Sequence, residues 1–327
     1  MKPAFSVLFF TVLAGAGLGA LAILALFDLV ATAAIAAPLA SPQWQALAAA
    51  IALALVVAGL CSSTLHLANP KNAWRSWSRW RTSWLSREAV VSLALMPVAA
   101  AYVACWWWDS ALMMRTLVAI ATLVLAWATL FCTAMIYASL KPIRQWHTWR
   151  VPVNFMLCGH ASGALVVAAV MRSQGLAATE LVVAAYMLFA GAAVGKVEYW
   201  QFIRGTTGAT TIEQAIGVAH GVRPPSPPGA TPSIMAARLF DTGHSRGTFL
   251  TREFVVNVAA SQRTRVLAIV WCFGFVLPMV WLAFGLARWQ GAVLATLACM
   301  IGMLAERWLF FADARHTVRL YHGERTT

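Results

Sequence analysis

Long apolar runs separated by short polar connections make up most of this chain. Eight of the runs are long enough to cross a hydrocarbon core of about 30 Å as helices. They lie at about 5–31, 43–65, 89–107, 112–139, 153–171, 180–203, 265–286 and 289–310. The pattern therefore predicts an all-α integral membrane protein, with a single transmembrane domain over residues 1–327. An even number of spans places both termini on the same side of the membrane.

Composition excludes a soluble globule. The 327 residues are 61% hydrophobic and 11% charged, whereas a soluble domain carries about 25% charged residues. The formal net charge of +13 does not indicate nucleic-acid binding, because the basic residues sit in the connections between apolar spans. That placement is what the positive-inside rule expects of a membrane protein.

The basic residues are distributed asymmetrically over the two sides of the predicted bundle. Of 24 lysines and arginines, 20 lie in the terminal tails and the even-numbered connections. The second connection alone carries Lys71, Arg75, Arg79, Arg81 and Arg87. This bias predicts that both termini and these connections are cytoplasmic.

The sixth connection, about 204–263, is the only long one. Its Pro-rich stretch from Arg223 to Gly229 cannot be helical. The second half, around Arg252-Glu253-Phe254, is compatible with a short interfacial helix. Two interpretations remain open for this cytoplasmic loop: a docking element for a partner, or a linker.

Residues 72–87 combine tryptophans with arginines. On a helical wheel Trp74, Trp77, Trp80 and Trp84 fall within about a third of the circumference, with arginines pointing away. The segment resembles an interfacial helix in the lipid headgroup layer. It serves either as an anchor alone or also as the lining of an entrance for an amphiphilic substrate.

His66 and Glu88 flank this tryptophan segment at one level in the membrane. Ionisable groups in spans are costly and are functional candidates by default. An imidazole can donate to or accept from a quinone or quinol oxygen, and a carboxyl group can exchange protons. The alternative is structural: His66 caps a helix end, and Glu88 pairs with Arg87 or Arg81.

Other polar residues in the spans have simpler interpretations. His160 either contributes to a polar pocket or hydrogen-bonds a neighbouring helix. Lys196 and Glu198 suggest an internal ion pair or snorkelling, Glu306-Arg307 ends the last span, and Asp28 is expected at the outer interface.

The cysteines and histidines do not have the spacing of cofactor ligands. The six cysteines form no CxxC, and we expect them to be buried as small hydrophobic residues. The two histidines in or at the spans do not match in depth. These patterns predict no metal site, no iron–sulfur cluster and no haem.

Several stretches resemble the dimethyl sulfoxide reductase anchor subunit family. The most specific are LHLANP at 65–70, AWR at 73–75 and SWLSRE at 83–88, and residues 1–7, 10–17 and 306–311 support them. The resemblance implies a membrane anchor for an iron–sulfur electron-transfer subunit and a molybdopterin catalytic subunit. It also implies binding of menaquinone or ubiquinone, with no catalysis by the chain alone. The site residues it implies are His66 and Glu88, with Arg87, Trp74 and His160 as further candidates.

The charge pattern favours one branch of this family. In the dimethyl sulfoxide reductase type the catalytic subunits are periplasmic, whereas the basic second connection here predicts partners on the cytoplasmic face of a bacterial inner membrane. That arrangement resembles the membrane subunit of cytoplasmic sulfite-oxidising complexes, which pass electrons from sulfite to quinone. The alternatives are a quinol-oxidising anchor of dimethyl sulfoxide reductase type in anaerobic respiration, a secondary transporter, or an anchor without a quinone site. A transporter is disfavoured because no internal repeat is visible.

Overall fold

The structure is a computed structural model that describes residues 3–33, 43–65, 70–176, 179–206, 211, 258–284, 289–322 and 326–327. Within these ranges the regular elements are helices, and the β-type pairing consists of isolated bridges. His66 and most of the sixth connection lie outside the described residues.

Eight helical segments are long and apolar enough to cross a membrane, which confirms the predicted all-α fold. They are α1 (Phe5–Ala33), α2 (Gln43–Thr64), α3 (Trp84–Trp107), α4 (Leu112–Ala138), α5 (Arg150–Ser173), α6 (Thr179–Thr206), the segment from α9 (Ala260–Ile269) to α10 (Leu277–Ala283), and α11 (Trp289–Ala312). Lengths of 22 to 29 residues correspond to about 33–44 Å at 1.5 Å per residue.

The start of α3 differs from the sequence interpretation. The helix begins at Trp84, and Ser83 is its N-cap, with the hydroxyl accepting a hydrogen bond from the Ser86 amide at 3.4 Å. The apolar run alone suggested a start at 89, because Arg87 and Glu88 interrupt it. Glu88 therefore lies inside the first turns of α3 and not at its edge.

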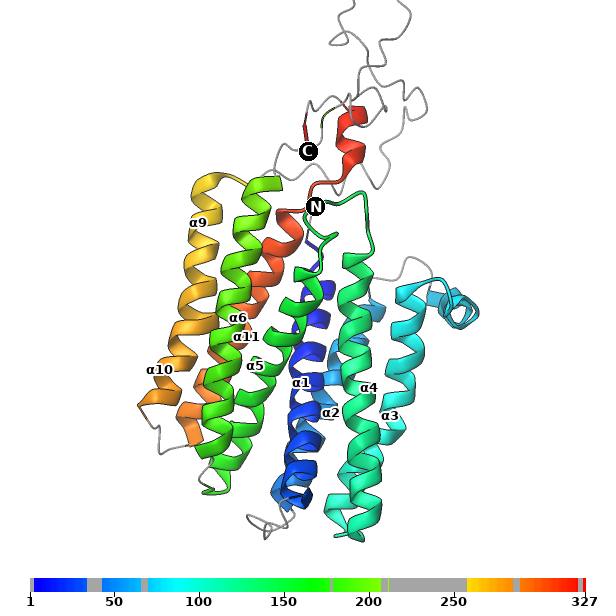
Figure 1. Ribbon diagram of the computed structural model, residues 1–327, viewed down its shortest axis with the longest axis vertical. Coiled ribbons are helices and arrows are strands. Elements are labelled where there is room, and N and C mark those ends of the chain that lie inside the picture. The colour runs from blue at the N-terminus through cyan, green and yellow to red at the C-terminus, as the bar shows by residue number, and fades with distance from the viewer. Residues whose placement is uncertain are drawn as a thin grey trace, which may run out of the picture.

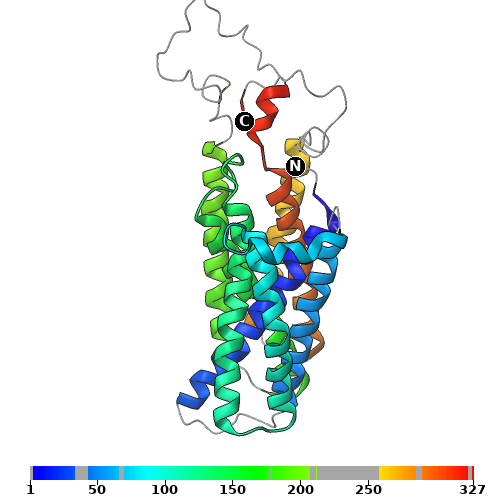
Figure 2. The same cartoon turned by 90° about the vertical axis from the view of Figure 1, so that its right-hand side faces the viewer.

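Helix α1 runs through the middle of the bundle, between α4 and α5 (Figure 1). It packs with α2, α3, α4 and the second half of α5 around one hydrophobic core. The rest of α5, with α6, α9–α10 and α11, encloses most of a second core. Both chain termini and the α2–α3 and α4–α5 connections lie at one end of the bundle (Figures 1 and 2). We call this end the terminal face.

Glycines allow α1 to approach α5 at backbone distance. A Cβ on Gly19 would lie 2.0 Å from the Gly159 carbonyl oxygen, and one on Gly163 would lie 2.3 Å from the Ala20 nitrogen. Close packing through small residues is a common way for helices to associate in lipid, where hydrophobic burial gives little driving force. The α1–α5 contact joins the two halves of the bundle.

A π-helical turn interrupts the seventh span at Val270–Val276, between α9 and α10. Pro278 has no amide hydrogen to donate to the Gly274 carbonyl four residues earlier. That carbonyl accepts instead from the Cys299 thiol at 3.9 Å. Gly274 also faces Gly302 on α11, where an added Cβ would lie 2.1 Å from the Gly274 nitrogen.

The α4–α5 connection and the segment after α11 cover part of the terminal face. Ile143 forms a β-bridge with His316, and the Trp146 indole donates to the Phe310 carbonyl at 3.0 Å. The Tyr137 ring lies 5.3–5.7 Å, between centroids, from the rings of Trp146, Phe155, Phe310 and Phe311. This aromatic layer fixes the end of α11 against α4 and α5.

Candidate functional site

Glu88 is buried at the start of α3, near the terminal face. Its residue exposure is 5%, and one carboxylate oxygen accepts a hydrogen bond from the Thr133 hydroxyl on α4. The Thr133 hydroxyl also contacts the Thr129 carbonyl of its own helix at 3.0 Å. The result is a carboxyl group placed between α3 and α4, with a single side-chain partner among the hydrogen bonds of the described residues.

Arg87 points away from Glu88. Its guanidinium donates to the carbonyls of Trp80 at 3.0 Å and Arg81 at 2.7 Å, and it stacks on the Trp84 ring at 4.2 Å. These contacts close the turn that leads into α3. In the described part of the chain, the alternative ion pair of Glu88 with Arg87 or Arg81 is therefore not formed.

His66 follows directly after Leu65, the last described residue of the α2 end. The Ser62 hydroxyl donates to the Ser6 carbonyl at 2.9 Å and fixes the end of α2 against the start of α1. The His66 imidazole itself lies outside the described residues, and its relation to Glu88 stays a prediction.

The tryptophan segment forms a 3₁₀ helix, η1 (Pro70–Arg79), where an α-helical wheel was assumed. In a 3₁₀ helix, residues three apart are eclipsed, so Trp74 and Trp77 form a row on η1, and Trp80 lies in the turn that follows it. All three are more than half exposed, and Trp74 is 69% exposed. The row is available to lipid or to a partner, and Arg75 lies over the Trp74 ring at 5.6 Å.

His160 links two helices. Its Nε2 accepts from the Trp127 indole at 2.9 Å, and its Nδ1 lies 2.7 Å from the Met156 carbonyl, which requires the proton on Nδ1. Trp127 and Thr133 are six residues apart on α4, or about 9 Å along the axis and about 120° around it. The structure thus does not bring His160 into the environment of Glu88, and its ring nitrogens are already engaged.

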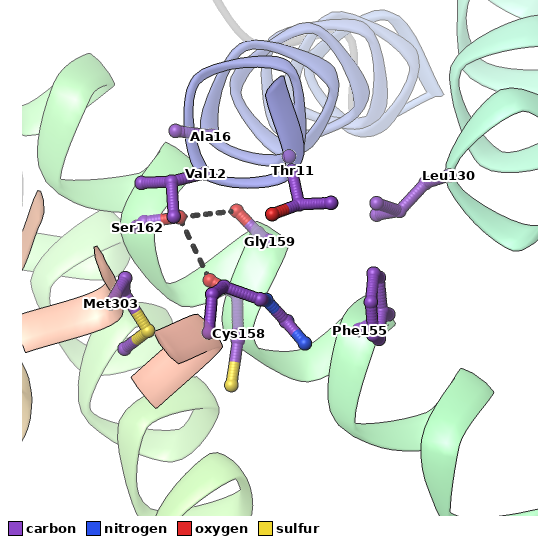
Figure 3. Close-up of a pocket in the computed structure, with 11 residues that line it drawn as sticks. Thr11, Val12, Ala16, Leu130, Phe155, Cys158, Gly159, Ser162 and Met303 are labelled. Carbon is purple, nitrogen blue, oxygen red and sulfur yellow. Dashed lines mark hydrogen bonds between the residues drawn. The ribbon is translucent and has the colours of Figure 1, made fainter. Parts of the chain in front are cut away.

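A recess lies between α1, α4, α5 and α11 (Figure 3). Its cavity volume is about 10 Å³, which is room for about one water molecule. Leu130 of α4 lines it, and Thr133, the partner of Glu88, is three residues further along the same helix. Neither Glu88 nor Thr133 is among the residues that line the recess, so the recess is not part of the Glu88 site.

A buried polar cluster lies between α5, α6 and α11, and the sequence pattern, which suggested an internal ion pair for Lys196, did not indicate its partner. Lys196 pairs with Glu306, and both are 1% exposed. The Arg307 Nε lies 3.3 Å from the second Glu306 oxygen, and Asn154 is buried beside them. Lys196 therefore pairs with a residue of the last span, while the expected partner Glu198 instead contacts Arg150 at 2.9 Å.

Asp28 is not interfacial, although the sequence suggested that it would be. It is 7% exposed near the end of the bundle opposite the terminal face. It accepts from the Gln45 amide at 2.9 Å, the Trp106 indole at 2.9 Å and the Tyr102 hydroxyl. The three donors come from α2 and α3, so Asp28 is a junction that joins three helices.

No group of three or more His, Cys, Asp or Glu side chains that could hold a metal ion occurs in the described part of the chain. The six cysteines are free, and Cys61 and Cys272 are exposed where burial was expected. Near the terminal face the described residues therefore offer a buried carboxyl group, Glu88, that belongs to no such cluster.

Comparison with known proteins identifies the family. The family model "DMSO reductase anchor subunit (DmsC)" matches residues 1–312. The chain belongs to this anchor subunit family. It is also 33% identical, over 98% of its length and 99% of the relative, to a sulfite dehydrogenase subunit of Allochromatium vinosum. The predicted resemblance is thereby confirmed, and the chain is a multi-pass membrane anchor subunit of a molybdoenzyme complex.

Proposed function

We propose that this anchor subunit binds quinone and quinol near its terminal face and exchanges electrons between the quinone pool and an iron–sulfur partner subunit. The observation that carries the proposal is the position of Glu88. A buried carboxyl group with one hydroxyl partner, and with no arginine paired to it among the described residues, is costly in a membrane protein. We infer that the carboxyl group is buried there because it exchanges protons with a bound carrier.

The chemistry assigns different tasks to the two proposed site residues. Reduction of a quinone to a quinol takes up two electrons and two protons. The electrons come from the partner subunit, while Glu88 passes protons between the ring oxygen and water at the terminal face. His66 donates to the other ring oxygen, and Arg87 and Trp74 shape the edge of the site from the turn and from η1. His160 serves the α4–α5 contact and supports the site only indirectly.

We propose sulfite oxidation as the reaction of the whole complex. Sulfite and water give sulfate, two protons and two electrons in a molybdopterin catalytic subunit, and the electrons reduce menaquinone or ubiquinone. The similarity to the sulfite dehydrogenase subunit supports this version. So does the basic bias of the terminal face, which favours the cytoplasmic side of a bacterial inner membrane for the termini and partners. Quinol oxidation coupled to sulfoxide reduction is the alternative within the family.

The test is quinone-coupled turnover of the purified complex carrying Glu88→Gln. Glutamine keeps the size and an acceptor for Thr133 but cannot release a proton. We expect the rate with decylubiquinone, relative to the rate with ferricyanide, to fall about 100-fold, as for loss of a general acid–base group. Glu180→Gln is the matched control, because Glu180 is an exposed acid at the start of α6, near the opposite end of the bundle.

An unchanged ratio in Glu88→Gln, with all subunits present, would remove Glu88 from the mechanism. Assaying the same preparation with sulfite as donor, and separately with a reduced quinone and dimethyl sulfoxide, distinguishes the two reactions. Activity only in the second assay would contradict the sulfite version while leaving the quinone site intact.

A further inference from the structure

The tryptophan segment carries a group of exposed cations without acidic partners. They are Lys71, just before the segment, and Arg75, Arg79 and Arg81 within it. None of the four takes part in an ion pair among the described residues, and residues 65–87 include no aspartate or glutamate. Like charges gathered on one short segment repel one another, so this group favours a ligand that brings negative charge.

Exposed indole rings alternate with these cations. Trp74 and Trp77 occupy one row of η1. Because a 3₁₀ helix has three residues per turn, Arg75 and Arg79 lie on the two other rows, one on each side of the tryptophans. Tryptophan is enriched at the membrane–water boundary because one end of its ring is apolar and the other can hydrogen-bond. Apolar rings flanked by basic side chains are typical of a segment that lies in the headgroup layer.

The position of η1 in the bundle also suits a contact with lipid. The helix runs across the bundle axis on the outer side of α3, near the terminal face (Figures 1 and 2). Its contacts with other helices are mainly with α3. That helix exposes Leu85 by 53% and Leu93 by 49%, so part of its surface faces lipid in this membrane protein. A segment beside a lipid-facing helix meets headgroups more directly than it meets a protein that docks on the terminal face.

We propose that the tryptophan segment binds the headgroups of anionic phospholipids, with its three exposed arginines on the phosphate groups. The planar guanidinium group presents N–H donors in a fork that matches phosphate oxygens. Each basic residue near an anionic bilayer surface strengthens binding about fivefold, so three arginines together predict a preference of about 100-fold over a zwitterionic lipid. The inference is independent of the proposed quinone site, because it requires neither Glu88 nor electron transfer.

The test is native mass spectrometry of the detergent-solubilised, delipidated complex titrated with phosphatidylglycerol or with phosphatidylcholine. The test variant combines Arg75→Gln, Arg79→Gln and Arg81→Gln. The matched control combines Lys141→Gln, Arg144→Gln and Arg204→Gln. The control removes the same charge from exposed positions in the α4–α5 connection and at the end of α6, which belong to the terminal face but not to the tryptophan segment.

We expect the wild-type complex to prefer phosphatidylglycerol, and the test variant to lose at least about tenfold of that preference, while the control keeps it. Raising the ionic strength from about 50 mM to about 500 mM should weaken the wild-type preference, because salt screens exposed charges. No preference in the wild type at low salt, or the same preference in the test variant, would overturn the inference. An unchanged lipid preference together with loss of the catalytic subunits from the test variant would also overturn it, by assigning the segment to a protein partner.

Discussion

Replacing Glu306 by glutamine should destabilise this protein far more than replacing Lys196 by methionine, although the two side chains form one ion pair. The reason is the third member of the cluster, Arg307. Glu306→Gln leaves two buried cations without a counter-charge. Lys196→Met leaves Glu306 and Arg307, which compensate each other.

The magnitudes follow from burial. Lys196, Glu306 and Arg307 are 1%, 1% and 4% exposed, so solvent screens little of their interaction. Breaking a buried pair and leaving a charge uncompensated costs about 3–5 kcal/mol. Lys196→Met replaces the ammonium by an apolar side chain of similar length and leaves the Glu306–Arg307 pair, so we expect a cost of about 1 kcal/mol, typical of a point substitution. The double variant restores the wild-type cluster charge of +1 and should therefore be more stable than Glu306→Gln alone.

The assay is the thermal stability of the detergent-solubilised complex, followed by tryptophan fluorescence and by the fraction of intact complex after heating. The predicted order is wild type, Lys196→Met, the double variant and, least stable, Glu306→Gln. Glu198→Gln is the control, because Glu198 pairs with Arg150 at a site where its side chain is 42% exposed. Partly exposed pairs contribute about 0–1 kcal/mol.

Two results would refute this reasoning. The first is equal destabilisation by Lys196→Met and Glu306→Gln, which would mean that the pair acts without Arg307. The second is a double variant less stable than Glu306→Gln, because charge balance would then not govern the cluster.

Two further predictions concern packing and the opposite end of the bundle. Gly302→Ala should lower stability by about 1–3 kcal/mol, since its Cβ would lie 2.1 Å from the Gly274 nitrogen; Gly205→Ala is the control, and equal melting temperatures would contradict the close contact. Asp28→Asn should cost about 1–3 kcal/mol, because an amide donor would face donors such as the Trp106 indole. The KM for quinone should not change in Asp28→Asn, and a tenfold rise would show that this junction is coupled to the site.

The eight helices were predictable because each apolar run is long enough to span lipid by itself. Their ends were less predictable where charge enters a helix. Glu88 and Arg87 interrupt the apolar pattern, yet α3 starts before them at Trp84, since the Ser83 cap and the Thr133 hydrogen bond make those positions acceptable. A helical wheel drawn for an α-helix cannot indicate the 3₁₀ geometry of η1. The three-residue spacing of its tryptophans nevertheless matches the three residues per turn of a 3₁₀ helix.

The buried polar contacts were not predictable from spacing because they join distant parts of the chain. Lys196 and Glu306 are 110 residues apart, and the nearby Glu198 was the more obvious partner in sequence. Asp28 lies close to a predicted interface by position, but its burial depends on donors from two other helices.

The most direct test of the quinone site is photolabelling of the native complex with a photoreactive ubiquinone analogue, followed by mapping of the labelled peptides. We predict labels on the start of α3 around Glu88 and on α4 around Thr133, its hydrogen-bond partner. Excess decylubiquinone should suppress these labels. Labels confined to the opposite end of the bundle, near Asp28, or labels that excess quinone does not suppress, would contradict a quinone site at the terminal face.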